Sequence, residues 1–196
     1  MLTFCLSIVA SAQTARISTV SGINGHCKAI DTLTEKSKTP DLIFADVSDY
    51  EKNDKAKWQK FDSEAALEKF REKTETYTIA LNWRKNGHVV ASNFTLFSGS
   101  GDWAKYVFQC FRDDGTLAKA KSELRTFYGD FVVTENRYFD AKGKLLKKTI
   151  RYSDLTTGKP KKPGESFFSD NSGYLKEKDY YMSTRKLPFA KLLDKK

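Results

Sequence analysis

The sequence predicts a mainly β protein of the α+β class: an antiparallel up-and-down meander of about eight long strands, with one N-terminal helix packed on the sheet. Two observations predict this fold, namely turn signals that recur at a nearly constant spacing and a high content of aromatic residues. The 14 Phe and 9 Tyr, against only 4 Pro, favour strands because flat rings pack well on a pleated surface. A chain of 196 residues, 39% of them hydrophobic, is long enough to form one domain around its own core.

Two interleaved series of glycines mark the turns of the predicted meander. The first series consists of Gly87, Gly115, Gly143 and Gly173, and the second of Gly101, Gly129 and Gly158. Within each series the spacing is 28 to 30 residues, so that a turn falls about every 14 residues and the strands between turns have roughly ten residues each. The expected strands are 76–84, 88–98, 103–112, 116–128, 131–140, 144–154, 165–170 and 174–184. A sheet of this size curls into a half-barrel around the helix or closes into a barrel.

The other segments complete a single domain. The predicted helix begins at Asp62 or Ser63, either of which can cap its N-terminus. Ala66, Leu67 and Phe70 recur at helical spacing and are expected to pack on the sheet. The predicted organisation is an irregular segment at 13–61 with a strand within 41–47, a helix at 62–74, the meander of hairpin repeats at 76–186, and a C-terminal tail at 187–196.

The first 12 residues, MLTFCLSIVASA, form an uncharged apolar run that ends in the small-x-small pattern Ala10-Ser11-Ala12. This pattern is typical of a signal peptide and its cleavage site, although no Lys or Arg precedes the run. The run is too short for a membrane span, which needs about 20 apolar residues. We therefore expect residues 1–12 to be a signal peptide and the protein to be exported, to a periplasm or out of the cell; a buried N-terminal strand is the alternative.

Cys27 and Cys110 remain in the chain after removal of the predicted signal peptide. In an oxidising compartment they can form a disulfide that ties the N-terminal segment to the sheet; two buried free thiols are the alternative. The chain has only two His and no CxxC motif, and it therefore offers little from which to build a zinc site. No metal and no cofactor are predicted.

Charge complementarity predicts a register for the middle of the meander. With a three-residue loop at 129–131 closing the hairpin between the fourth and fifth predicted strands, Arg125 lies opposite Glu135 and Glu123 lies opposite Arg137. In the next hairpin, Glu135 lies opposite Lys148. Opposite charges that face each other across strands stabilise a sheet by roughly 0.2 to 1 kcal/mol per pair, and this agreement favours the register.

Aromatic and charged residues gather on the middle strands. The candidate ligand-binding residues are Trp83, Trp103, Tyr106, Tyr138, Arg125, Glu135 and Arg137. Neither face of these strands is cleanly apolar, which predicts a solvated surface or a polar cleft. The formal net charge of +9 favours an anionic ligand beside an apolar one, whereas the Lys and Arg residues are too scattered to predict nucleic-acid binding. The leading hypothesis is a non-enzymatic binding protein for an apolar or anionic ligand or an envelope partner.

Two other functions fit the pattern. A hydrolase would use either Asp residues at the turns or Glu123 and Glu135 as paired carboxylates, because these two lie on adjacent predicted strands. Their Arg partners would lower the pKa values of both carboxyl groups, which disfavours a general acid. A structural protein would instead assemble through an exposed edge strand. No catalytic residue is assigned.

The turn segments FRDDGTL (111–117) and FDAKGKL (139–145) resemble hairpin repeats of bacterial surface and exported proteins, including MORN-type repeats. The plan of an exported meander with a helix against it is similar to lipocalins and to periplasmic lipoprotein-carrier half-barrels. The first resemblance covers only the turns and the second only the architecture, so neither implies a function.

Overall fold

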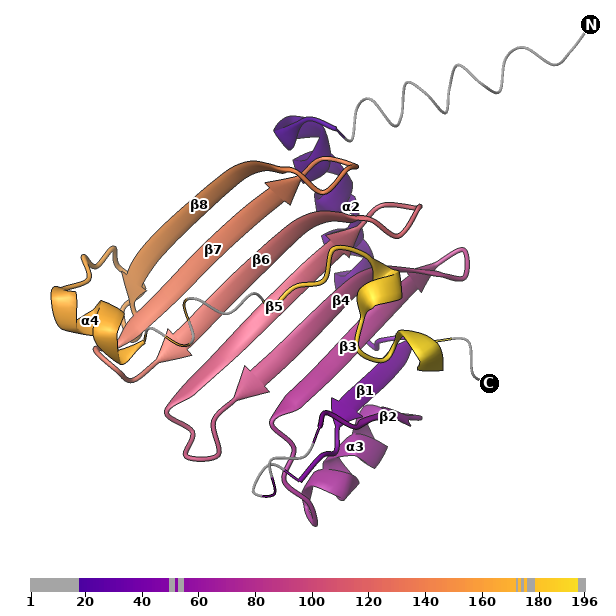
Figure 1. Ribbon diagram of the computed structural model, residues 1–196, viewed down its shortest axis with the longest axis horizontal. Coiled ribbons are helices and arrows are strands. Elements are labelled where there is room, and N and C mark those ends of the chain that lie inside the picture. The colour runs from indigo at the N-terminus through magenta and orange to yellow at the C-terminus, as the bar shows by residue number, and fades with distance from the viewer. Residues whose placement is uncertain are drawn as a thin grey trace, which may run out of the picture.

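The computed structural model describes residues 18–49, 52, 55–171, 173, 175 and 179–193, and these contain an open antiparallel sheet of eight strands (Figure 1). The strands are β1 (Leu42–Asp46), β2 (Trp58–Phe61), β3 (Thr78–Lys85), β4 (His88–Phe97), β5 (Trp103–Phe111), β6 (Leu117–Thr126), β7 (Phe131–Phe139) and β8 (Leu145–Asp154). Their order is β2-β1-β3-β4-β5-β6-β7-β8, so that from β3 onward each strand lies beside the next one in sequence. The predicted meander is confirmed, and it does not close into a barrel. The signal peptide predicted at 1–12 lies outside the described residues.

Six predicted strands, those between residues 76 and 154, are present with ends that differ by at most two residues. The turn between β3 and β4 shows why the glycine spacing was informative. Asn86 and Gly87 both have positive φ angles, 53° and 81°, as a tight two-residue hairpin turn requires. At Gly115 the missing side chain also makes room for the C-terminal segment, because a Cβ atom there would lie 2.6 Å from Thr184 Oγ1.

Every second hairpin carries a shift of register close to its turn. The shifts lie between Trp83 and Arg84, between Cys110 and Phe111, and between Tyr138 and Phe139, beside the turns at Gly87, Gly115 and Gly143. The hairpins that turn at Gly101 and Gly129 show no such shift. In an up-and-down sheet these shifts therefore all lie at the same end. A shift of this kind is a β-bulge, which increases the local twist of the strands.

The last two predicted strands are wrong. Residues 165–170 form a short helix, α4 (Glu165–Asp170), whose Phe167 packs on Phe131 with ring centroids 4.3 Å apart. The described residues of 174–184 contain no strand; those from 179 onward belong to a segment, 179–193, with two 3-10 helices, η1 (Thr184–Lys186) and η2 (Ala190–Leu192). The aromatic residues of these two segments pack on a face of the sheet instead of forming further strands. The count of eight is completed by β1, which was expected, and by β2, which was not.

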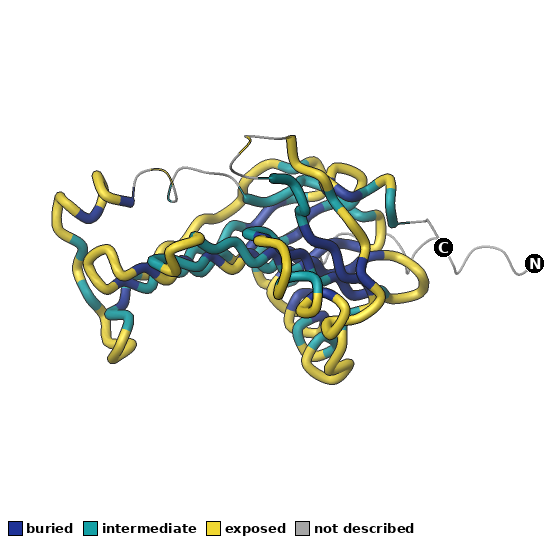
Figure 2. Tube along the Cα trace, turned by 90° about the horizontal axis from the view of Figure 1, so that it is seen from below, coloured by how far each residue is buried: buried dark blue, intermediate teal, exposed yellow. Residues whose placement is uncertain are grey.

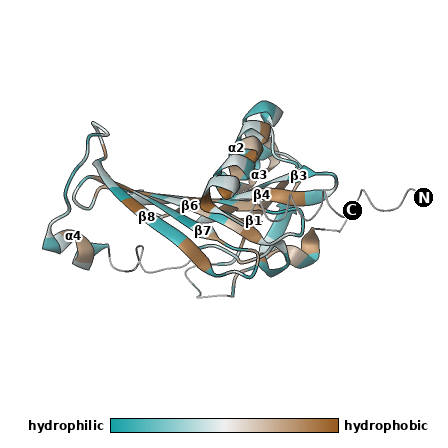
Figure 3. Cartoon of the chain, turned by 90° about the horizontal axis from the view of Figure 1, so that it is seen from above, coloured by the Kyte–Doolittle hydropathy of each residue, from teal (hydrophilic) through white to brown (hydrophobic). Residues whose placement is uncertain are grey.

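Two α-helices cover one face of the sheet (Figure 3). The predicted helix is present as α3 (Glu64–Arg71), with the Ser63 side chain accepting a hydrogen bond from Ala66 N at 3.1 Å and Leu67 buried. The longer helix, α2 (Val20–Ser37), was missed and replaces the irregular segment expected there. None of the helices in the described part of the chain combines the length and apolar character of a membrane span.

The core of α2 is a stripe of three buried residues at helical spacing. Ile23, Cys27 and Ile30 pack on the sheet beside Trp83 and Tyr138. The Thr19 side chain caps the helix by accepting a hydrogen bond from Gly22 N. These are the signals from which α2 is readable in the sequence, although its Gly and Ser content weakens the helix propensity.

On the opposite face of the sheet, segment 179–193 covers β1 to β5 and one end of β6 and β7, and α4 packs on the other end of β6 to β8. Leu187 and Phe189, predicted to lie in a tail, are buried, and the Phe189 ring stacks on Phe44 with centroids 4.2 Å apart. Seen from the side, the molecule is thick where β1 to β4 lie and becomes thinner toward β8 (Figure 2). We call the thin part, β6 to β8, the wing.

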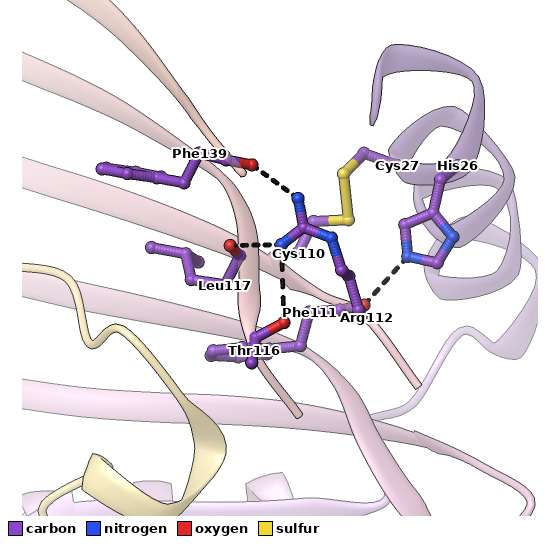
Figure 4. The surroundings of a disulfide bond; sticks show 8 residues. All are labelled: His26, Cys27, Cys110, Phe111, Arg112, Thr116, Leu117 and Phe139. Atoms are coloured by element: carbon purple, nitrogen blue, oxygen red, sulfur yellow. Dashed lines mark hydrogen bonds between the residues drawn. A yellow bond between two sulfur atoms is a disulfide. The ribbon is translucent and has the colours of Figure 1, made fainter. Parts of the chain in front are cut away.

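A disulfide between Cys27 and Cys110 joins α2 to β5, with Cα atoms 5.8 Å apart (Figure 4). This is the first of the two alternatives expected for these cysteines. Both residues are at most 2% exposed. Beside the disulfide, His26 Nε2 is hydrogen-bonded to the Phe111 carbonyl oxygen at 2.9 Å, so the helix is tied to β5 at consecutive residues on each side.

Arg112 fills the bulged end of the sheet next to this disulfide (Figure 4). Its guanidinium donates to the carbonyl oxygen of Leu117, at 2.7 Å, and to that of Phe139. Both carbonyls lie next to bulges, where the regular ladder is interrupted. Burial lowers the pKa of Arg112, while the nearby Asp114 and Asp140 favour its charged form. A single side chain thus joins β5, β6 and β7.

We expect replacement of both cysteines by alanine (Cys27→Ala with Cys110→Ala) to lower the free energy of unfolding by about 2–5 kcal/mol, because the bond closes a loop with a sequence separation of 83 residues. Urea unfolding of the oxidised wild type and the double variant measures the difference. Wild-type protein unfolded in excess dithiothreitol should match the double variant. Equal midpoints for oxidised wild type and double variant would contradict a stabilising bond.

Candidate ligand-binding cavity

The observed register of β6 and β7 differs from the predicted one. Arg125 lies opposite Val132 and Ser122 lies opposite Glu135, because the hairpin closes with Thr126 opposite Phe131 around a four-residue loop. The predicted loop was shorter. In this loop Gly129 and Asp130 both adopt positive φ, 76° and 54°, which gives the longer turn its shape.

This shift of three residues reverses which side chains share a face. Glu123 and Arg125 lie on the face covered by α2, whereas Glu135 and Arg137 lie on the opposite face. The carboxylate pair of the hydrolase hypothesis, Glu123 with Glu135, is therefore separated by the sheet itself, and that prediction is wrong. Each Glu instead pairs with the Arg two positions along its own strand, Arg125 or Arg137.

The seven candidate residues divide between the two faces. On the α2 face lie Trp83, Tyr106, Tyr138 and Arg125, and on the other face lie Trp103, Glu135 and Arg137. Trp83 and Tyr138 are buried in the core under α2, so they pack and do not line a site. The Arg125 guanidinium lies 5.8 Å from the Tyr106 ring centroid on an open part of the surface. Tyr106 and Arg125 line a more open pocket on the α2 face, and Glu135 and Arg137 line a more enclosed cavity on the opposite face.

This cavity has a volume of about 310 Å³ and lies on the face opposite α2, over β5 to β8. Its apolar lining includes Val107, Leu124, Val133, Ile150, Tyr152 and Phe168. Its polar lining includes Lys105, Glu135, Arg137, Lys148, Asp179 and Tyr180. Strands provide the floor, while α4 and the segment that begins at Asp179 provide described parts of the wall. The cavity thus combines an apolar body with a charged rim.

Two cations share one carboxylate in this rim. Arg137 Nε and Lys148 Nζ both contact Glu135, with the lysine 3.1 Å from Oε2. Glu135 and Lys148 were expected to lie directly opposite each other; Lys148 instead lies opposite Arg137, and reaches Glu135 diagonally on the same face. Arg137 also donates to the Tyr180 hydroxyl at 3.1 Å and lies over its ring.

A second ion pair, between Lys105 and Asp179, closes the other side of the cavity. Both side chains are nearly buried, at 8% and 13% exposed. The pair fixes the segment that begins at Asp179, together with a hydrogen bond of 2.7 Å from Tyr181 N to Gln109 Oε1. Burial, and the charge of Asp179, raise the pKa of Tyr181, which therefore stays neutral at physiological pH. The cavity rim contains three cations, Lys105, Arg137 and Lys148, against two carboxylates.

The hydrogen bonds at Glu135 decide its charge. Burial raises the pKa of this carboxyl group, but hydrogen bonds from Arg137 and Lys148 outweigh it and hold the pKa below its ordinary value of 4.5. The hydrogen bond that Arg137 donates to Glu135 in turn raises the pKa of Arg137. Glu135 is therefore ionised at neutral pH and poorly suited to act as a general acid. The described residues contain no group of three or more His, Cys, Asp and Glu placed to hold a metal ion.

Comparison of the chain with protein-family models, with curated proteins and with solved structures finds no match. The cavity is thus interpreted from its own chemistry. The described part of the chain combines an open β-meander with a disulfide-tied helix on one face and a partly covered, positively charged cavity on the other.

Sequence reasoning found Glu135 and Arg137 but missed four wall residues, Lys105, Phe168, Asp179 and Tyr180. Lys105 carries a readable signal, since it lies among Trp103, Val107 and Gln109 on alternate positions of one strand and so shares their face. The other three lie in segments that were predicted as strands. Their contribution depends on where the chain returns after β8, which no local pattern shows.

We expect Glu135→Gln to lower the free energy of unfolding at pH 7 by about 1–3 kcal/mol, because two cations lose their charged acceptor. Since the folded pKa of Glu135 is lowered, its stabilising contribution is present above pH 4.5 and is lost as the pH falls through the folded pKa. The difference between wild type and variant should therefore shrink below pH 4.5, as measured by urea unfolding between pH 7 and pH 3.

Glu123→Gln is the matched control for this prediction, because its ion pair lies on the other face with an arginine side chain that is 57% exposed. The effect of this control should be under about 1 kcal/mol, as for exposed pairs in general. A gap between wild type and Glu135→Gln that stays constant from pH 7 to pH 3 would contradict the assigned role of the carboxylate.

Proposed function

We propose that this protein is a non-enzymatic binding protein that holds a small amphipathic molecule with an anionic group in the cavity over β5 to β8. The observation that carries the proposal is the cavity itself: apolar side chains form its body, and a rim with more cations than carboxylates lies beside them. An amphipathic anion matches both parts at once.

The cavity has the size and the apolar lining of a ligand site. Its volume of about 310 Å³ is at the lower end of the range for small-molecule pockets, about 300 to 1,000 Å³. Leu124 and Val133 are buried in its floor, while Ile150 and Phe168 remain 42% and 46% exposed at its border. Apolar contact with these residues would remove water from both the ligand and the protein.

Charge supports an anionic group on the ligand. Arg137 and Lys148 both contact Glu135, so this cluster keeps one positive charge beyond what its carboxylate neutralises. Lys148, the more exposed of the two cations at 41%, is the residue most open to an incoming anion. A carboxylate, sulfonate or phosphate group placed here would neutralise the excess.

The proposal includes export of the protein, with residues 1–12 as the signal peptide. Support comes from the Cys27–Cys110 bond, because disulfides persist mainly in oxidising compartments such as the periplasm or the cell exterior. A cavity ligand or an envelope partner would be met there.

Two dyes with the same ring system test the pairing of apolar body and anionic group. We expect 1-anilinonaphthalene-8-sulfonate to bind the folded protein more tightly than N-phenyl-1-naphthylamine, which lacks the sulfonate. Lys148→Met should weaken sulfonate-dye binding about tenfold, the value of one charge-assisted hydrogen bond, and leave the neutral dye within about twofold. Fluorescence titration measures both, with circular dichroism confirming that each variant is folded.

Lys147→Met is the matched control, because Lys147 is the neighbouring lysine on β8 but faces the other side of the sheet. It should change neither affinity by more than about twofold. Ile150→Trp, which fills the cavity from its border, should weaken both dyes. Absence of binding by both dyes, or equal losses in the two lysine variants, would contradict the proposal.

A further inference from the structure

Strand β8 forms one edge of the sheet (Figure 1). At its far end Asp154 N donates to the Lys159 carbonyl oxygen at 2.9 Å, and Lys161 N donates to that of Tyr152 at 3.3 Å. The backbone groups of Tyr152 and Asp154 therefore point away from β7. Because this direction alternates along a strand, the N–H and C=O groups of Lys148 and Ile150 point outward as well.

The chain itself uses this edge, but only over its last residues. Residues 159–161 lie against the outer side of β8, with a bridge between Pro160 and Ser153. Among the described residues no segment pairs with the outer side of β8 from Leu145 to Ile150. The outer edge of β8 thus pairs with residues 159–161 at one end. Its outward-pointing backbone groups at Lys148 and Ile150 pair with no other described segment.

The side chains along the open part combine apolar surface with positive charge. Leu145, Leu146 and Ile150 are each at least 40% exposed. Between residues 142 and 151 the chain has five basic residues, Lys142, Lys144, Lys147, Lys148 and Arg151, and no acidic one. Lys147 and Arg151 project to the face opposite the cavity, and Lys148 projects to the cavity face, where it pairs with Glu135.

We propose that the outer edge of β8 binds an extended acidic segment of a partner protein as a ninth strand. In such β-augmentation the backbone hydrogen bonds of the edge supply affinity and the alternating side chains supply specificity. Acidic residues of the added strand would lie beside Lys147 and Arg151 on the face opposite the cavity, and apolar ones beside Ile150 on the cavity face. Lys147 and Arg151 lie on the face opposite the ligand cavity, whereas the side chains of Lys148 and Ile150 also line that cavity.

The same charges disfavour a second copy of this chain as the occupant. Antiparallel pairing of β8 with its own copy would bring Lys147, Lys148 and Arg151 close to the same residues of the other chain, and like charges opposite each other destabilise a sheet. Lysines on edge strands are a common protection against self-pairing. An acidic strand turns this repulsion into attraction.

A capped heptapeptide of alternating Glu and Val is the probe for this edge. We expect it to bind the full-length protein and to slow hydrogen exchange of the Lys148 and Ile150 amides at least tenfold, as measured by NMR. The amides of Lys147 and Thr149, which point toward β7, should not change. The same peptide N-methylated at alternate residues keeps its side chains but loses its donors on one edge, and should bind at least tenfold more weakly.

Charge is tested on the protein with Lys147→Glu combined with Arg151→Glu, two residues outside the cavity lining. This variant should bind the Glu–Val peptide at least tenfold more weakly while binding N-phenyl-1-naphthylamine as the wild type does. Equal binding of a Lys–Val heptapeptide, or equal binding of heptaglutamate without protection of Lys148 and Ile150, would overturn the proposal. So would binding of phosphatidylglycerol vesicles without any binding of the peptide, or dimerisation that protects these two amides.

Discussion

The ion pair between Lys105 and Asp179 is the constraint on which the candidate site depends. It is nearly buried, and a buried pair recovers little or none of the cost of removing its charges from water. Its consequence is therefore one of position more than of stability. It holds the start of segment 179–193 over β5, beside the hydrogen bond from Tyr181 to Gln109, and so gives the cavity a wall. Without that wall, the described lining of the cavity would be limited to the strands, α4 and Leu175.

The two faces of the sheet are held by different means. On one face a covalent bond fixes α2 through Cys27 and Cys110, and apolar packing completes the contact. On the other face the chain returns after β8 and is held by Phe189, by the Lys105 ion pair and by backbone hydrogen bonds near Gly115. Neither layer covers all of the wing, so the exposed apolar residues of the molecule concentrate there. Both the cavity and the open edge are consequences of this uneven cover.

Features set by local sequence could be predicted, and features set by distant contacts could not. Turn positions such as Asn86-Gly87 follow from backbone sterics at one or two residues, and this is why six strands were placed correctly. The predicted register is wrong because charge complementarity across strands favours a shorter loop at Gly129, whereas the charged pairs form along each strand, as in Glu135 with Arg137. Gly173 continued the spacing but not the sheet. The wall residue Asp179 lies 74 positions beyond its partner Lys105, a distance over which no sequence pattern is informative.

The bulges beside Gly87, Gly115 and Gly143 give the repeat a geometric meaning. Beside every second turn, one strand of the hairpin contains one residue more than its partner, and these extra residues all lie at the same end of the sheet. Because each bulge bends its strand and increases the local twist, bulges at one end of the sheet bend the sheet. The curvature of the sheet then depends on the number of residues in each strand more than on the identity of their side chains. Deleting one bulge residue would flatten the wing and change the width of the cavity, although none of the residues that line it had been altered.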